Sequence, residues 1–331
     1  MTAYIRPKVN LIHNHTIKIA MSIALALLFL SASSAGAMDL LLGSGKTGSF
    51  SNFVGKSICR AINRHADDLH CSVSPAPDDM HSITNLAGGS LDICLLDSKT
   101  IYDAVKRRGN FQYLDILYDN LLSLQRIYDI PVTLAVRQDA GITSLDGLKG
   151  KRINAGPPGS LQNLMVETIM SAKGWTKKEF SLMDELPDSQ SQADMAFCHG
   201  TIQAMVHIGV HPDPSVQQLL KLCGASLVGM DDSDIQQFVG GHPAFINTTL
   251  KSSMYPELTQ DIPTLGTSML LISSRDLDEE TVYSIMDALY RSQKKLNNAH
   301  PALSGFTDKG AEDLDIGLER HPGAIKFFSD M

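Results

Sequence analysis

The sequence predicts an α/β protein made of two lobes, and three observations carry that prediction. Short apolar strands alternate with helices from residue 39 onward, which is typical of a mixed sheet flanked by helices. The alternation starts again near Gln138, and each part contains a glycine-rich loop between a strand and a helix, at 43–49 and 156–160. We therefore expect a first lobe at 38–135, a second at 136–261 with a hinge between them, and a final segment, 262–331, that returns to the first lobe.

In the first lobe, helix spacing and apolar runs define the elements. The helix expected at 50–64 is the best defined, because Phe53, Val54, Ile58 and Ile62 recur on one helix face. The other expected helices are 82–87 and 100–107, and the expected strands are 39–42, 71–74, 91–96, 121–126 and 132–137.

The second lobe opens with a segment rich in turn signals. Gly150 is expected to end a short helix, because glycine accepts the left-handed conformation, and 152–155 can extend as a strand. The Gly-Pro-Pro-Gly corner that follows is rigid at its prolines, and Ser160 is expected to cap a helix at 161–172. The remaining expected elements are helices 192–197, 215–222 and 278–297 and strands 204–208 and 268–273.

The first 37 residues have the order of a cleavable export signal. Arg6, Lys8 and Lys18 make the start positive, no Asp or Glu occurs, and the apolar run 19–30 precedes small residues that end at Ala37. A membrane anchor is the alternative, but an apolar run of this length is short for a bilayer core of about 30 Å. We expect cleavage near Ala37 and a periplasmic mature protein.

Charge and composition argue against several partners. The formal net charge is −8, and removing the three leader cations makes it −11. The sequence has no basic stripe for nucleic acid and no polybasic membrane patch, and its single Trp argues against base stacking. We expect no nucleic-acid partner, no cofactor and a monomer.

Five cysteines follow the leader, and an oxidising compartment favours disulfides. Cys59 and Cys71 flank a helix end and the next strand, and Cys198 and Cys223 flank a strand and a helix. This pairing leaves Cys94 alone in an apolar run, although an odd number keeps other pairings open. No Cys-x-x-Cys spacing occurs, so zinc and thioredoxin-type sites are not expected.

The first glycine-rich loop contains Gly45-Lys46-Thr47, which invites comparison with a P-loop. That motif needs a glycine at position 40, where this chain has Leu, and an exported protein lacks an ATP supply. The better interpretation is a loop whose backbone N–H groups, with the hydroxyls of Thr47 and Ser49, donate hydrogen bonds to a carboxylate. A purely structural turn is the alternative.

The second loop, from Gly156 to Ser160, offers amides at a helix start in the same way. Two such loops at matching places predict a ligand site where the lobes meet. Ser98 begins the helix after strand 91–96 and is a further candidate donor, although capping explains it equally well.

A third candidate element is the segment 207–212, which begins with His207. Gly209 and Pro212 indicate a strand end and a loop, so His207 and His211 do not have the spacing of a helical metal site. We interpret the segment as a strand that runs into the ligand site, with His207 as a candidate contact. No Gly-x-Ser-x-Gly elbow occurs, so catalysis is not expected and an exported hydrolase is only an alternative.

Several segments together resemble one family. They are the leader, the loop 42–45, Leu91-Asp92-Ile93, the segment 144–152, the corner 156–160, the stretch 204–212 and the ending 321–328. These are similar to the TAXI family of solute receptors for TRAP transporters. The resemblance implies a periplasmic-binding-protein type II fold that closes on a small carboxylate, such as glutamate or 2-oxoglutarate, and delivers it to a TRAP-type membrane permease. It also implies the disulfides Cys59–Cys71 and Cys198–Cys223.

The same resemblance implies a set of ligand contacts. They are Thr47, Gly48, Ser49 and Phe50 in the first loop, Ser98, the corner residues Gly156, Pro157, Pro158, Gly159 and Ser160, and His207, Gly209 and Tyr255 in the second lobe. An exported binding module that signals to a sensor protein is the alternative function.

Overall fold

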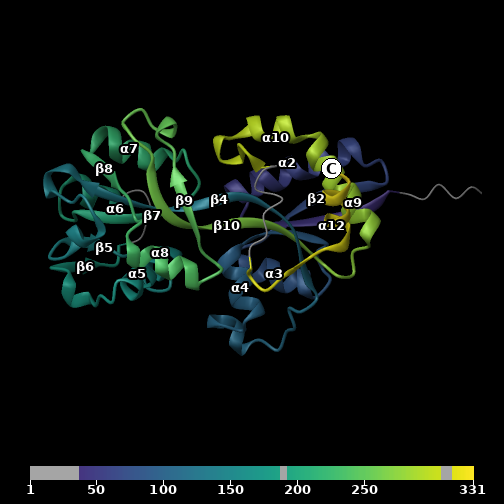
Figure 1. Cartoon of the computed structure of the whole chain (residues 1–331), viewed down its shortest axis with the longest axis horizontal. Helices are drawn as coiled ribbons and strands as arrows, with labels where there is room; N and C mark the ends of the chain where they lie inside the picture. Colours follow the sequence, from purple (N-terminus) through teal and green to yellow (C-terminus); the bar gives the residue numbers. More distant parts are fainter. Residues whose placement is uncertain (1–36, 187–191, 307–314) are drawn as a thin grey trace, which may run out of the picture. The chain divides into compact units, whose positions relative to one another are not determined.

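Two long strands, β4 (Leu121–Arg137) and β10 (Ile262–Ser274), form the middle of a mixed sheet of 11 strands (Figure 1). The computed structural model describes residues 37–186, 192–306 and 315–331, so the expected leader lies outside the described residues except for Ala37. Helices pack on both faces of the sheet (Figure 1). This arrangement confirms the α/β class with a mixed sheet flanked by helices.

The first half of the sheet carries the N-terminal and C-terminal elements. Its N-terminal elements are β1 (Met38–Ser44), α2 (Phe50–His65), β2 (Leu69–Pro75), α3 (Asp79–Ala87), β3 (Ile93–Asp97), α4 (Ser98–Val105) and a 3-10 turn at Gly109–Tyr113. Its C-terminal elements are α9 (Glu279–Arg291), α10 (Gln293–Ala299), a 3-10 turn at Pro301–Leu303, β11 (Glu319–Arg320) and α12 (Pro322–Asp330).

The second half lies between β4 and β10 in the sequence. Its strands are β5 (Arg152–Asn154), β6 (Leu182–Asp184), β7 (Ala204–Ile208), β8 (Ala225–Val228) and β9 (Ile246–Leu250). Its helices are α5 (Leu161–Ala172), α6 (Ala193–Cys198), α7 (Pro214–Leu222) and α8 (Ser233–Gly241), with 3-10 turns at Gln138–Ala140, Leu145–Leu148, Lys177–Glu179 and Ser252–Met254.

The largest differences from the expected elements concern three strands and one helix. The strands expected at 121–126 and 132–137 are one strand, because Tyr128 and Asp129 stay paired with Met269 and Ser268 of β10. The strand expected at 268–273 extends back to Ile262, because β9 pairs with its first part. The helix expected at 278–297 breaks at Ser292 into α9 and α10, because the backbone there leaves the helical conformation, with φ −93° and ψ 2°.

The strands of the two halves point toward one another across β4. In the first half, Asp97 at the end of β3 lies opposite Met269 of β10, which in turn lies opposite Tyr128 of β4. In the second half, β7 runs antiparallel to β4 and ends with Ile208 opposite Val132. The two strand ends therefore face each other across four residues of β4, or about 13 Å at the usual rise of a strand.

Glycine permits the close approach of β4 and β10 between these ends. Gly266 lies opposite Pro131, and a Cβ on Gly266 would lie 2.6 Å from the carbonyl oxygen of Ile130. Nearby on the same strand pair, Asp129 accepts hydrogen bonds from Arg126 Nη2 at 2.6 Å and from Ser268 Oγ at 3.2 Å. Backbone contact and these polar side chains therefore hold the two strands together.

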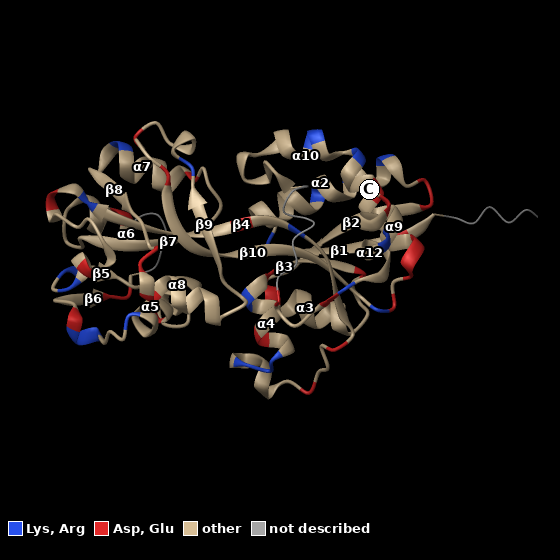
Figure 2. Ribbon diagram, viewed as in Figure 1, with Lys and Arg blue, Asp and Glu red and all other residues tan. Residues whose placement is uncertain are grey.

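Separate apolar clusters stabilise the two halves. One cluster lies under α2, α9 and α12 in the first half, and another packs under α5 and α8 in the second. Two disulfides, Cys59–Cys71 and Cys198–Cys223, are the pairings favoured above, and Cys94 is a free, buried thiol. Among the described helices, none is both long and apolar enough to cross a membrane. Positive and negative residues are interspersed along the ribbon (Figure 2).

Candidate functional site

The two glycine-rich corners share an eight-residue pattern, G-x-x-G-S-x-x-N. The first corner is 45–52, between β1 and α2, and the second is 156–163, between β5 and α5. Each half of the sheet therefore presents the same local sequence after a parallel strand and at the start of a long helix. We call these segments the first corner and the second corner.

In the first corner, the serine and the asparagine close the helix start. Ser49 is the N-cap of α2, and its Oγ accepts a hydrogen bond from the N–H of Asn52 at 3.2 Å. The Asn52 Oδ1 accepts from the N–H of Gly48 at 3.5 Å, and the N–H of Ser49 donates to the Lys46 carbonyl at 2.9 Å. Thr47, at the tip of this turn, is exposed.

The second corner repeats these bonds atom for atom. Ser160 caps α5 and accepts from the N–H of Asn163 at 3.1 Å, and Asn163 Oδ1 accepts from the N–H of Gly159 at 3.4 Å. The N–H of Ser160 donates to the Pro157 carbonyl at 3.0 Å. Gly48 and Gly159 have φ values of +86° and +77°, which a residue with a side chain rarely adopts, so the glycine before the serine is required in both corners.

The two corners present helix-start amides for a ligand. The first N–H groups of a helix have no partner inside it, and here the cap serine satisfies only the third residue of each helix. The N–H groups of Phe50 and Ser51 in one corner and of Leu161 and Gln162 in the other therefore remain for another acceptor. Together with the helix dipole, such amides favour a negatively charged group.

Strand register places each corner beside a strand end. β1 pairs in parallel with β3 (Gly43 opposite Cys94), and β5 pairs in parallel with β7 (Asn154 opposite Met205). β5 ends at Asn154, whereas β7 continues to His207 and Ile208. The strands β3, β10, β4 and β7 thus lie between the corners, and none of the described hydrogen bonds joins one corner directly to the other.

Asp97 at the end of β3 and Asp79 at the start of α3 are two carboxyl groups with raised pKa values. Burial raises the pKa of Asp79 to about 7, and the nearby charge of Asp97 raises it further. Burial also raises the pKa of Asp97, although Thr267 donates a hydrogen bond to it. Asp79 therefore holds its proton to a higher pH than an ordinary carboxyl group does. Tyr128, whose pKa burial also raises, lies close to both groups.

Ser98 is fully buried and already hydrogen-bonded. Its hydroxyl donates to the Ala244 carbonyl at 2.7 Å and accepts from the Ser268 N–H at 3.0 Å. It therefore joins α4 to β10 and to the segment before β9, and in this conformation it is not available to a ligand.

The segment after β7 contains a buried hydrogen-bonded chain. His211 contacts Tyr255 Oη through Nδ1 at 2.5 Å and Thr133 Oγ1 through Nε2 at 2.8 Å, and Tyr255 Oη also accepts from the Asp213 N–H at 2.6 Å. Burial lowers the pKa of His211 to about 4, so the ring is neutral at physiological pH. These hydrogen bonds hold the loop that follows β7 and includes Gly209, and Tyr255, only 1 % exposed, supports that loop.

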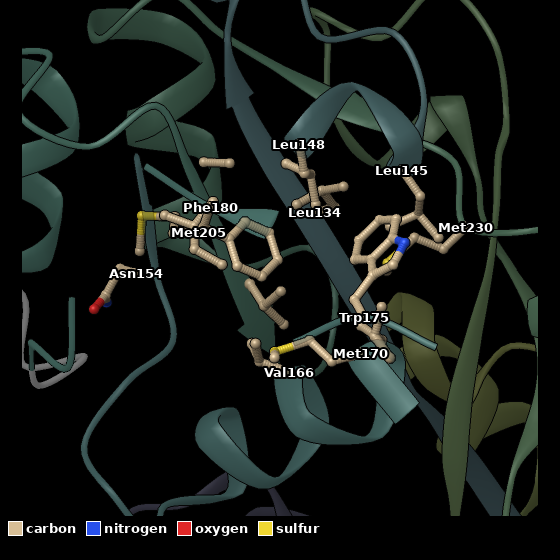
Figure 3. A pocket seen from close by; sticks show the side chains of 14 residues that line it. Leu134, Leu145, Leu148, Asn154, Val166, Met170, Trp175, Phe180, Met205 and Met230 are labelled. Atoms are coloured by element: carbon tan, nitrogen blue, oxygen red, sulfur yellow. The ribbon is translucent and has the colours of Figure 1, made fainter. Parts of the chain in front are cut away.

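The cavity in the core of the second half is too small for a solute. It measures about 20 Å³ and is lined by apolar side chains that include Trp175, Phe180 and Met205 (Figure 3). The amide of Asn154 points away from this cavity (Figure 3). Its Oδ1 accepts hydrogen bonds from the N–H groups of Gly156 and Leu186. Asn154 therefore shapes the second corner. Within the described ranges, no three His, Cys, Asp or Glu side chains gather as a metal site.

Gly156→Ala is expected to disrupt the second corner. Gly156 has a φ of +76°, and an added Cβ would lie 2.5 Å from Gln162 Oε1 and 3.0 Å from Gln162 Cβ. Strain and displacement together should lower the free energy of unfolding by about 1–3 kcal/mol. Urea unfolding measures this, with Gly240→Ala as the control, because a Cβ there meets no atom within 4 Å. Equal stability of the two variants would contradict the described corner.

Fold and corners together define a class. A central mixed sheet flanked by helices matches the periplasmic-binding-protein fold of the solved structures. The periplasmic sulfonate-binding protein SsuA from Methylobacillus flagellatus KT is 12% identical, over 83% of this chain and 74% of that chain, with a TM-score of 0.52. XAC2383 from Xanthomonas citri, bound to ATP, is 13% identical, over 88% and 94%, with a TM-score of 0.50.

The particular family follows from the sequence match. The NMT1-like family matches residues 42–331, which is nearly all of the described chain, and the chain belongs to this family. The match begins in β1, just before the first corner, and includes the second corner and the C-terminal helix.

Two features of the site were missed by sequence reasoning. The repeated G-x-x-G-S-x-x-N pattern is visible in the printed sequence, and aligning the two glycine loops on their Gly-Ser pairs would have found it. Asp79 gave no signal, because its importance depends on the strand end that α3 covers.

Proposed function

We propose that this protein is an extracytoplasmic solute-binding receptor without catalytic activity. It captures a small carboxylate, of the size of glutamate or 2-oxoglutarate, and passes it to a TRAP-type membrane permease. The family, the fold and the solute-binding names of its structural neighbours support the first part. The resemblance described above supports the permease.

The matched pair of corners is the observation that carries this proposal. Each corner offers the N–H groups of the first two residues of a helix, at the positive end of the helix dipole. Each hydrogen bond to a charged group contributes about 1.5–3 kcal/mol, so one ligand that contacts both corners is held far more tightly than by either. Such a ligand also favours the closed arrangement of the halves.

Thr47→Ala together with Ser160→Ala is expected to lower the affinity for a small acid at least tenfold. Thr47 supplies a hydroxyl at the first corner, and Ser160 fixes the amides of the second. Calorimetric titration after a thermal-shift screen of amino acids and dicarboxylates measures the effect, since a ligand that binds the folded state raises its melting temperature.

The matched control for this double variant is Asp278→Ala. It removes the cap of α9, where Asp278 accepts from the Thr281 N–H, so it costs about 1 kcal/mol of stability without touching either corner. Unchanged affinity in the double variant would reject Thr47 and Ser160 as contacts. Wild-type protein that responds to none of the acids would reject the carboxylate receptor itself.

A further inference from the structure

Gln162 is buried at the second corner and has no hydrogen-bond partner. Its side chain is 5 % exposed, and neither Oε1 nor Nε2 bonds to any atom of the described chain. The amide packs directly on Gly156, because a Cβ added there would lie 2.5 Å from Gln162 Oε1. A buried amide without partners costs free energy that a protein ordinarily avoids, so this one calls for an explanation.

The first corner supplies an internal comparison. Ser51 occupies the place of Gln162 in the shared pattern, and its Oγ accepts from the N–H of Gly45, the counterpart of Gly156, at 3.2 Å. In the second corner, the N–H of Gly156 is instead taken by Asn154 Oδ1 at 3.3 Å. The Gly156 N–H is therefore satisfied without the side chain of Gln162.

A second unpartnered group lies on the neighbouring strand. β7 pairs in parallel with β5 at Asn154 and continues to His207, whose Nε2 is buried and makes no hydrogen bond in the described chain. That nitrogen lies 3.7 Å from Asp213 Oδ2, which is beyond hydrogen-bond distance. The absence of a side chain at Gly209 leaves room for the His207 ring, because a Cβ on Gly209 would lie 2.9 Å from His207 Nε2.

We propose that the Gln162 amide is a specificity-determining contact for the ligand, with His207 beside it. This inference rests on the proposed function. Nε2 of Gln162 donates to the ligand carboxylate at the start of α5, and Oε1 accepts from a donor on the adjacent carbon. The site therefore selects 2-amino or 2-hydroxy acids over 2-oxo acids, because a 2-oxo group has no proton to donate and leaves Oε1 unpaired.

The test compares glutamate, 2-hydroxyglutarate and 2-oxoglutarate by calorimetry on three proteins. Wild-type protein is expected to bind the first two at least tenfold more tightly than 2-oxoglutarate. Gln162→Met keeps the length of the side chain without its polar atoms, and it should bind the three acids within about threefold of one another. Gln162→Asn shortens the side chain by one methylene group. It replaces Gln162→Met in the same comparison if the Met variant does not fold.

Gln125→Met is the matched control. Gln125 lies on β4 opposite Leu271, is 1 % exposed, and has an amide that is equally without partners in the described residues. In the absence of ligand, both Met variants should melt at a higher temperature than the wild-type protein. Only Gln162→Met should lose the preference for glutamate and 2-hydroxyglutarate over 2-oxoglutarate. A preference that persists in Gln162→Met and Gln162→Asn, or a wild type that binds 2-oxoglutarate most tightly, overturns the inference and leaves the receptor intact. Wild-type protein that binds none of the acids overturns the receptor, and the inference with it.

Discussion

Removal of both disulfides is expected to lower the free energy of unfolding by about 6 kcal/mol. The bridges join residues separated by 12 and 25 positions, and loop entropy assigns about 3 kcal/mol to closing loops of these lengths in the unfolded chain. Cys59–Cys71 ties α2 to β2, and Cys198–Cys223 ties α6 to the end of α7. Since a domain is usually stable by only about 5–15 kcal/mol, the doubly reduced protein should be close to unfolding.

Urea unfolding of Cys59→Ala/Cys71→Ala and of Cys198→Ala/Cys223→Ala measures each bridge separately. Wild-type protein under reducing conditions should match the combined variant, because Cys94 is already free. A loss of less than about 1 kcal/mol for either pair would contradict the loop-entropy account of that bridge.

Asp79→Asn is expected to stabilise the protein above neutral pH. The pKa of Asp79 is about 7 in the folded protein against 3.8 in an unfolded chain, so the folded state holds the proton more tightly between these values. Wild-type stability therefore falls as the pH rises from about 4 to about 7, by at most about 4 kcal/mol. Because Asp79 is partly exposed, we expect the advantage of the neutral Asn to grow by about 2 kcal/mol between pH 5 and pH 8.

Chemical unfolding of both proteins at pH 5 and pH 8 checks this result. Asp78→Asn is the control, since Asp78 caps α3 beside Asp79 and is exposed. An advantage of Asp79→Asn that is the same at both pH values would mean that Asp79 is charged throughout. The pair of carboxyls at the end of β3 would then oppose an anionic ligand.

Local signals in the sequence predicted the parts of the fold that local chemistry fixes. The helix at 161–172 and the strand at 204–208 have the expected bounds, because Ser160 caps the first and Gly209 follows the second. Gly150 and Gly156 adopt positive φ values, as a turn at each required. These features depend on a few neighbouring residues.

Features that depend on distant pairing could not be predicted in this way. The single course of β4 through Asp129 is set by β10, which is more than 130 positions away in the chain. Capping was one local explanation for Ser98, but Asp97 is the cap of α4, and the hydroxyl of Ser98 bonds to Ala244 and Ser268. The lobe boundaries and the ligand contacts, Tyr255 among them, remain predictions.

Hydrogen exchange at the two corners tests the central claim most directly. Mass spectrometry would follow peptides that cover 48–53 and 159–164, with and without the acid selected by the thermal screen. We predict that exchange slows in both peptides, because the N–H groups of Phe50 and Ser51 and of Leu161 and Gln162 bind one ligand. Slowing in only one corner, or in neither, would contradict a site shared by the two halves.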